Sequence, residues 1–334
     1  MNVVEYRPDP GEFAWTFGGV PPVRTVKPGD ALSIWTEDCF AGKVRSERDL
    51  VSQVCEFPFL NPQTGPFYVD GARPGDTLAL HFVSIEPATD FGAATTVPFF
   101  GTLTSDAQTA TLQDALPELV WLYELDNAKR TVTFNAKSAE LTLELPMDPM
   151  HGTVGVAPAA LEARSALVPD SHGGNLDTPE MRAGVTAYFG VNVEGALFSL
   201  GDGHARQGEG EACGTGVEVA MNTVVIVELI QGMATPWPRL ESDTHLMSIG
   251  AARPLENAYR VAQVDMTGWL SELYGVDRMD AYQIVAQASL TPVAQVCNPI
   301  YTVTSKLPKA LLPAANAYRG IHADLRARAH RLSG

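Results

Sequence analysis

The chain lacks the features that would assign it to several broad classes of protein. It contains no run of about eighteen apolar residues, so the sequence predicts no transmembrane helix. Its 23 lysines and arginines are outnumbered by 39 aspartates and glutamates, and the net charge of −16 argues against nucleic acid or an anionic membrane as a partner. The N-terminus shows no basic region followed by an apolar one, so we expect no secretory signal and predict a cytoplasmic location.

Cysteine is scarce, and the few thiols are scattered. Cys39, Cys55, Cys213 and Cys297 form no C-x-x-C pair of the kind that holds a metal. In a reducing compartment we expect all four to be free thiols. Three of them stand beside apolar residues and are interpreted as small buried hydrophobes, whereas Cys213 has polar, reactive neighbours.

Low-complexity linkers are absent, and the first two thirds of the chain have the pattern of strands. Pro28-Gly29-Asp30 and Pro74-Gly75-Asp76 each precede a run of alternating apolar residues, which predicts a turn that leads into a strand. Further alternation between residues 118 and 145 predicts hairpin strands, and residues 217–230 continue in the same style. At 334 residues the chain is long enough to bury a large core.

The last third of the chain has a different pattern. From Leu255 to Leu273, apolar residues recur at the three- and four-residue spacing of an amphipathic helix, and Gly275 is a suitable stop. Asp280 is expected to cap a second helix that runs to Gln287. The sequence then predicts a return to strand over 293–304 and a terminal helix over 310–328.

The most informative stretch is the glycine segment, residues 201–216. It holds six glycines among its sixteen residues, interleaved with Asp202, His204, Glu209, Glu211 and Cys213. So many glycines disfavour a helix or a plain strand and suit a loop whose backbone a small molecule can approach. We therefore interpret the glycine segment as part of a site.

A second polar segment, residues 169–178, places histidine and aspartate around a Gly-Gly pair. Between the two segments, residues 185–200 are rich in β-branched and aromatic side chains, and Gly195 is expected to divide them into two short strands. This order of loop, strands and loop can bring both polar segments to the same end of a sheet.

These residues carry a family resemblance. Four stretches occur in order, namely 35–42 with Asp-Cys-Phe, 65–78 with Gly-Pro-Phe-Tyr-Val-Asp-Gly-Ala, 152–158 with Gly-Thr-Val-Gly-Val-Ala-Pro, and 171–218 with both polar segments. Together they resemble the signature of the acetamidase/formamidase family. The resemblance implies a mainly β fold, with a jelly-roll-like sandwich plus a barrel-like β portion and a small α/β C-terminal part. We expect an N-terminal β-sandwich portion over 1–150, a site-bearing β portion over 151–250 and the α/β part over 251–334.

The resemblance also implies a function. It implies hydrolysis of the carbon–nitrogen bond of a small amide, such as formamide, acetamide or a γ-lactam, by a homo-oligomer with zinc or calcium in its site. In a metal-dependent mechanism, His172, Asp38 and Asp177 supply ligands of the right types together with His204, and Glu211 is the general base.

Two alternatives stay open at this point. In one, Cys213 attacks the amide directly and is activated by His204 or by Glu211. The metal mechanism is favoured over it because the four carboxylate and imidazole groups exceed what a thiol mechanism needs. In the other, the chain is a non-catalytic β-sandwich module that binds calcium through its acidic loops. Histidine in both polar segments argues against a pure calcium site.

Other residues of the two segments have weaker assignments. Asp202 is assigned to catalysis, although capping a turn through its own backbone explains it equally well. Asn175, with Gly173, Gly174 and Gly214, is expected to bind substrate, and Asn175 is equally suited to a left-handed position after the glycines.

Overall fold

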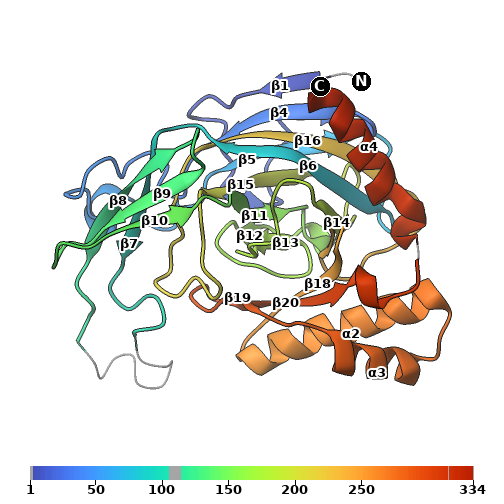
Figure 1. The fold of residues 1–334 in the computed structure, drawn as a ribbon. Coiled ribbons are helices and arrows are strands. Elements are labelled where there is room, and N and C mark those ends of the chain that lie inside the picture. The colour runs from blue at the N-terminus through green and yellow to red at the C-terminus, as the bar shows by residue number, and fades with distance from the viewer. Residues whose placement is uncertain (1–2, 105–113, 315, 334) are drawn as a thin grey trace.

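The computed structural model describes residues 3–104, 114–314 and 316–333. Strands make up most of its regular structure, and the longer helices lie toward the C-terminus (Figure 1). The predicted mainly β class with a small C-terminal helical part is confirmed. None of the helices within the described ranges is long and apolar enough to cross a membrane.

A nine-stranded sheet runs across the molecule (Figure 1). Its strands, in spatial order, are β1 (Val3–Tyr6), β4 (Ala31–Thr36), β16 (Met221–Ile230), β6 (Thr77–Pro87), β14 (Thr186–Gly190), β17 (Arg239–Glu241), β18 (His245–Ala252), β20 (Tyr301–Pro308) and β19 (Val293–Gln295). The β1–β4 pair is parallel and the other neighbours are antiparallel. This one sheet takes strands from all three predicted portions of the chain, whose boundaries stay a prediction.

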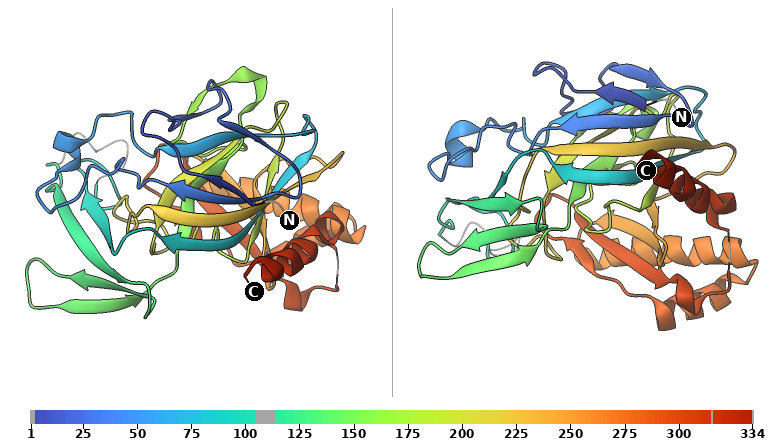
Figure 2. Two further views of the ribbon diagram at one scale, coloured as in Figure 1. Left: turned by 90° about the horizontal axis from the view of Figure 1, so that it is seen from above. Right: turned by 45° about the horizontal axis from the view of Figure 1, so that its top comes forward.

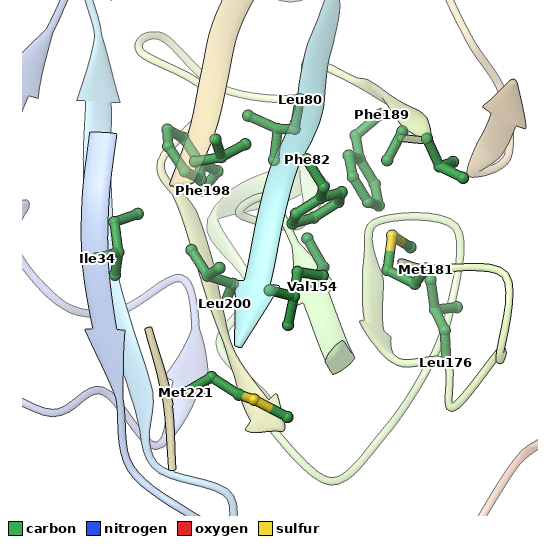
Figure 3. Close-up of a cluster of buried hydrophobic side chains, with 14 of the residues drawn as sticks. Ile34, Leu80, Phe82, Val154, Leu176, Met181, Phe189, Phe198, Leu200 and Met221 are labelled. Atoms are coloured by element: carbon green, nitrogen blue, oxygen red, sulfur yellow. The ribbon is translucent and has the colours of Figure 1, made fainter. Parts of the chain in front are cut away.

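A five-stranded sheet packs against it. In spatial order it consists of β13 (Gly173–Asn175), β11 (Met150–Gly155), β15 (Phe198–His204), β5 (Gln63–Val69) and β3 (Arg24–Val26). Figure 3 shows Leu80 and Phe82 of β6 beside Phe198 and Leu200 of β15 and Val154 of β11, all of them buried in one cluster. This sandwich core holds β15 in place, and the end of β15 carries the site described below.

Two smaller sheets complete the β structure. An antiparallel four-stranded sheet of β7 (Phe91–Thr96), β8 (Leu119–Asp126), β9 (Thr131–Asn135) and β10 (Thr142–Pro146) projects to one side of the sandwich (Figure 2). It confirms the hairpin strands predicted between residues 118 and 145. The fourth sheet pairs β2 (Thr16–Phe17) with β12 (Arg164–Ser165).

Both Pro-Gly-Asp turns lead into strands as predicted. In each turn the aspartate carboxylate accepts a hydrogen bond from the amide of the residue three positions earlier, at 2.9 Å in the first and 3.0 Å in the second. Gly29 and Gly75 have φ of 97° and 94°, which is the left-handed conformation that this turn requires and glycine adopts without strain. Strands β4 and β6 begin one residue after the aspartates.

The helices agree with the sequence prediction in part. Helix α2 (Leu255–Tyr274) ends at Gly275, which is left-handed with φ of 62° as a C-terminal glycine stop should be. The cap predicted for the second helix was wrong. Helix α3 (Arg278–Ala288) is capped by Asp277, whose carboxylate accepts from the Met279 amide, and Asp280 lies in its first turn. A short helix α1 (Val51–Val54) was not predicted.

Two C-terminal predictions need correction. The strand predicted over 293–304 is divided into β19 and β20, which pair with each other. The terminal helix predicted over 310–328 begins later, as α4 (Ile321–Ser333). Short 3₁₀ turns at Lys309–Leu311 and Ala317–Gly320 precede it, and left-handed Tyr318 and Arg319 interrupt the helical backbone there.

A buried hydrogen-bond relay joins α4 to the nine-stranded sheet. Nε2 of His322 donates to the Asp243 carboxylate at 3.2 Å, so the neutral ring offers Nδ1 as an acceptor. Nδ1 accepts from the Thr186 hydroxyl at 2.9 Å, and the same hydroxyl oxygen accepts from Nδ1 of His81 at 2.9 Å. Burial, and then the neighbouring His322, lowers the pKa of His81 from 6.5 to about 4.

The relay predicts how stability depends on pH. A depressed folded-state pKa means that the contribution of His81 is complete above pH 6.5 and is lost as the pH falls toward 4. The loss amounts to ~3 kcal/mol for a shift of this size. His81→Asn keeps a nitrogen donor for Thr186 but cannot titrate, so its free energy of unfolding should fall less over this range. Urea unfolding of both proteins across the range measures this, and equal losses would contradict the assignment to His81.

Candidate active site

Two carboxylates meet at the end of β15 because glycine stands between them. Gly152 on β11 faces Asp177 and Asp202, and a Cβ atom at Gly152 would lie 2.2 Å from one Asp177 oxygen and 2.6 Å from one Asp202 oxygen. Any side chain at this position would separate the two acids. Asp177 and Asp202 are themselves left-handed, with φ of 45° and 57°. Such strained positions cluster at functional sites.

His204 lies between further acids. Its Nε2 is 3.0 Å from the Glu218 carboxylate and 3.4 Å from Asp202, and its Nδ1 is 2.9 Å from Oε1 of Gln207. The Gln207 amide nitrogen donates to the backbone carbonyls of Asp177 and Ala294, so its oxygen must accept from Nδ1. Nε2 therefore faces two carboxylates and requires either a proton or a cation.

The electrostatics of His204 follow from this geometry. Burial alone would lower its pKa, but the carboxylates of Glu218 and Asp202 outweigh burial and raise the pKa well above the usual range. Without a cation the ring is thus held as an imidazolium. A metal ion at Nε2 would take the place of that proton.

Asp177 has a free oxygen. Its Oδ2 accepts a 2.5 Å hydrogen bond from the Asn298 amide, whereas Oδ1 is buried and finds no hydrogen-bond partner among the described residues. Burial, followed by the nearby Glu211 and Asp202, raises the pKa of Asp177 well above its usual range. An unpartnered buried carboxylate oxygen is costly unless it binds a proton or a cation.

Glu211 completes this part of the site. One of its oxygens accepts a hydrogen bond from the Cys297 thiol at 3.1 Å. Burial raises the pKa of Glu211 to about 8; His204 opposes the rise, and Glu218 and Asp202 add to it. One donor atom each from Asp177, His204 and Glu211 lie within 4.8 Å of one another, as do donor atoms of a second group, Cys39, Asp202 and Glu218.

The two groups form one acid cluster, defined here as Asp177, Asp202, His204, Glu211 and Glu218. All five side chains are buried. Within the described ranges, none of the four carboxylates forms an ion pair with lysine or arginine. Because buried charges need compensation, this composition indicates a site for a cation.

An amide-rich ring holds Asp202 in position. The Asn61 side-chain nitrogen lies 3.0 Å from Oδ2 of Asp202 and 3.1 Å from the side-chain oxygen of Asn175. The Thr153 hydroxyl also donates to Asp202, at 3.0 Å, and contacts Asn175. These hydrogen bonds to one oxygen leave the other oxygen of Asp202 facing His204.

A cavity of about 450 Å³ opens onto the acid cluster. Its polar lining consists mainly of buried side chains, namely Asn61, Asn175, Asp202, Glu211, Glu218 and Asn298. Elsewhere it is lined largely by apolar residues, of which Phe57 and Phe99 are 78% and 57% exposed. The acids therefore lie at the deep end of the cavity and the aromatic side chains lie at its mouth.

The structure brings together one part of the predicted site. Asp177, Asp202, His204 and Glu211 belong to the acid cluster, and Asn175 and Gly214 line the cavity. Gly173 and Gly174 do not line it. They pack on the neighbouring backbone, since a Cβ atom would lie 2.3 Å from the Val154 carbonyl oxygen at Gly173 and 2.4 Å from that of Val168 at Gly174.

The other predicted residues lie outside the acid cluster. The His172 ring packs edge-on against Phe17, with centroids 5.2 Å apart, and burial, followed by Arg164, lowers its pKa to about 4. The Asp38 carboxylate accepts from the amides of Phe40 and Gly42 at 3.0 and 2.9 Å and so holds its own loop. Cys213 is exposed, does not line the cavity, and directs its thiol at the Thr215 carbonyl, 3.4 Å away.

Several residues of the site were missed by the sequence reasoning. Glu218 closes the last of the four matching stretches, which is the signal that could have singled it out. Asn61 and Asn298 stand in no such pattern. Cys39 and Cys297 are buried as predicted. They also contact acids: the Cys297 thiol donates a hydrogen bond to Glu211, and the Cys39 thiol lies beside Glu218.

The chain is similar to known proteins over most of its length. The model of the Acetamidase/Formamidase family matches residues 14–161 and 157–311. A formamidase from Methylophilus methylotrophus is 24% identical over 259 residues, which span 64% of this chain and 62% of the formamidase.

Solved structures show the same likeness. The crystal structure of an acetamidase from Yersinia enterocolitica has a TM-score of 0.87 at 38% identity and covers 93% of each chain. An acetamidase from Bacillus halodurans has a TM-score of 0.82 at 29% identity, over 92% of this chain and 98% of the other. A gamma lactamase from Delftia acidovorans has a TM-score of 0.58 at 18% identity, over 92% of this chain and 91% of the other. At this identity the likeness shows a shared fold alone. With a family model matched over most of its length, this chain belongs to the acetamidase/formamidase family.

Proposed function

We propose that the chain is an amidohydrolase that uses a divalent cation, with zinc favoured over calcium. It takes up one water, breaks the carbon–nitrogen bond of an amide R–CO–NH₂ or of a γ-lactam, and yields the carboxylate and the freed amine, which is ammonia for an open-chain amide. The observation that carries the proposal is the acid cluster, which has no cationic partner from lysine or arginine in the described ranges and stands at the deep end of a cavity.

The residues present fit a metal ion. Asp177, Asp202 and His204 would hold it: Asp177 has an unpartnered oxygen, and Gln207 directs Nε2 of His204 away from itself. An imidazole with carboxylates suits zinc, whereas calcium prefers oxygen ligands alone. A zinc ion held there would supply Lewis acidity and would lower the pKa of water.

The surrounding side chains orient these groups. Asn298 fixes Asp177, Gln207 fixes the His204 ring, and Asn61 fixes Asp202. Partners of this kind set the orientation and the basicity of metal ligands. The same partners hold the three groups in one arrangement before any substrate arrives.

Glu211 is assigned as the proton-transferring group. It lines the cavity and lies within 4.8 Å of donor atoms of Asp177 and His204. Since Cys297 engages one of its oxygens, the other can take a proton from water and deliver it to the departing nitrogen. Glu218 also lines the cavity, and its carboxylate suits the N–H groups of an amide.

A cytoplasmic location and a homo-oligomeric state belong to the same proposal. Support for self-association comes from α2 and α3, where Tyr259, Val264, Met279 and Tyr282 are 49–63% exposed. An apolar surface of this kind is typical of a face that associates with another protein surface.

Metal content tests the ligand assignment. Asp177→Asn removes a charge from the proposed ligand set, and we expect metal affinity to fall at least by the ten- to hundredfold that the loss of an orienting partner costs, about 1.4–2.7 kcal/mol. Asp38→Asn is the matched control because it also removes a buried carboxylate charge, while Asp38 bonds the amides of Phe40 and Gly42 and pairs with Arg45, all outside the acid cluster. Elemental analysis after dialysis against limiting zinc measures both, and an unchanged metal-to-chain ratio in Asp177→Asn would sink the assignment.

Glu211→Gln tests the proton-transfer role. Glutamine has the same size but cannot accept the proton, so kcat for ammonia release from acetamide should fall by roughly 10²–10⁴-fold while the circular dichroism spectrum is kept. Wild-type turnover in a folded Glu211→Gln protein would show that another group moves the proton.

Chemical labelling of Cys213 distinguishes the metal mechanism from the thiol mechanism. Iodoacetamide should label Cys213 first, because it is exposed whereas burial raises the pKa of the Cys39 and Cys297 thiols. Ammonia release should survive this labelling and be abolished by a chelator. Inactivation of the wild type that Cys213→Ala prevents, as followed by peptide mass spectrometry and the ammonia assay, would support the thiol mechanism instead.

A further inference from the structure

The cavity at the acid cluster is larger than formamide or acetamide needs. Its volume is about 450 Å³. An apolar cavity of roughly 150 Å³ already accommodates benzene. A one- or two-carbon amide seated against the acids would therefore leave most of the cavity to water.

The chemistry of the lining tells which substrates would fill that space. The charged residues of the lining are Asp202, Glu211 and Glu218, all at the deep end; within the described ranges no lysine, arginine or histidine contributes to it. The rest of the wall is predominantly aliphatic and aromatic. A carboxylate on the acyl group of the substrate would thus lie among apolar side chains with no cationic side chain to pair with it, whereas an apolar group would gain contact area with the wall.

The apolar wall is fixed to the glycine segment. One edge of the Phe100 ring packs on Gly214, where a Cβ atom would lie 2.3 Å from the nearest ring carbon. The Thr102 amide donates to the Ala212 carbonyl at 2.7 Å, so the loop that carries Phe99 and Phe100 is hydrogen-bonded to the segment that carries Glu211. Wall and acids are therefore built as one unit, at a fixed separation.

We infer that this site selects amides with a bulky, uncharged apolar acyl group, such as an aryl or longer alkyl chain, over formamide and acetamide. The inference rests on the proposed amidohydrolase function. The amide would lie against the acid cluster, and the acyl group would lie along Phe100 toward the aromatic mouth. Each methylene that becomes buried should raise kcat/KM about fourfold, until the cavity is full.

The test is a substrate series on the zinc-loaded protein. Ammonia release is measured for formamide, acetamide, butyramide, phenylacetamide and the carboxylate-bearing succinamate. We expect kcat/KM to rise along the first four and to be lowest for succinamate. A kcat/KM that is highest for formamide or acetamide and falls with each added carbon would overturn the inference while leaving the proposed function intact.

Variants of the wall make the test specific. Phe100→Ala should lower the ratio of kcat/KM for phenylacetamide to that for acetamide by about fifteenfold, the equivalent of two buried methylenes. Phe99→Ala should act in the same direction and is a second variant at an exposed position, where truncation spares the core. Leu143→Ala on β10 is the control, since Leu143 is 44% exposed and outside this cavity. An unchanged ratio in both wall variants overturns the inference.

Failure of the proposed function gives a different result. If no amide releases ammonia, the amidohydrolase assignment is overturned, and the selectivity is then judged by calorimetric binding. Phenylacetamide should bind more tightly than acetamide, and equal affinities would overturn the inference as well.

Discussion

The structure depends on one electrostatic constraint, which is the burial of four carboxylates around a single imidazole. Each of these groups would be destabilised in the interior without compensation. The protein compensates them in part with neutral donors: Asn61 and Thr153 for Asp202, Asn298 for Asp177, and the Cys297 thiol for Glu211. The remaining negative charge calls for protons or a cation.

The acid cluster lies at the end of a strand that is anchored in the sandwich core. Strand β15 begins in the sandwich core, where Phe198 and Leu200 pack (Figure 3). The same strand carries Asp202 and ends at His204. Apolar packing thereby fixes the position of groups that repel one another. Strand β15 links the apolar packing of the core to the electrostatics of the acid cluster. A substitution that shifts this strand in the core should therefore also displace the acids.

Polar and apolar side chains line opposite ends of the one cavity. Polar side chains gather at its buried end and aromatic ones at its exposed mouth. Because low-dielectric walls strengthen electrostatic interactions, the apolar lining increases the effect of the acids on whatever lies between them.

The sequence by itself determined the features that depend on residues close together along the chain. The Pro-Gly-Asp turns, helix α2 with its stop at Gly275, and the reactive character of the glycine segment all follow from backbone preferences and from side chains a few residues apart. The acidic and imidazole members of that segment, Asp202, His204 and Glu211, were identified for this reason.

Only the tertiary structure decided which distant residues join them. Asn61 meets Asp202 across 141 positions, and Asn298 meets Asp177 across 121, contacts that no local pattern encodes. His172 has the sequence context of a ligand, yet Phe17 from the N-terminal region covers its ring. Short stretches of sequence determine the chemical type and the local conformation of a residue. The burial of a side chain, its pKa and its neighbours in space are determined only when remote strands pack together.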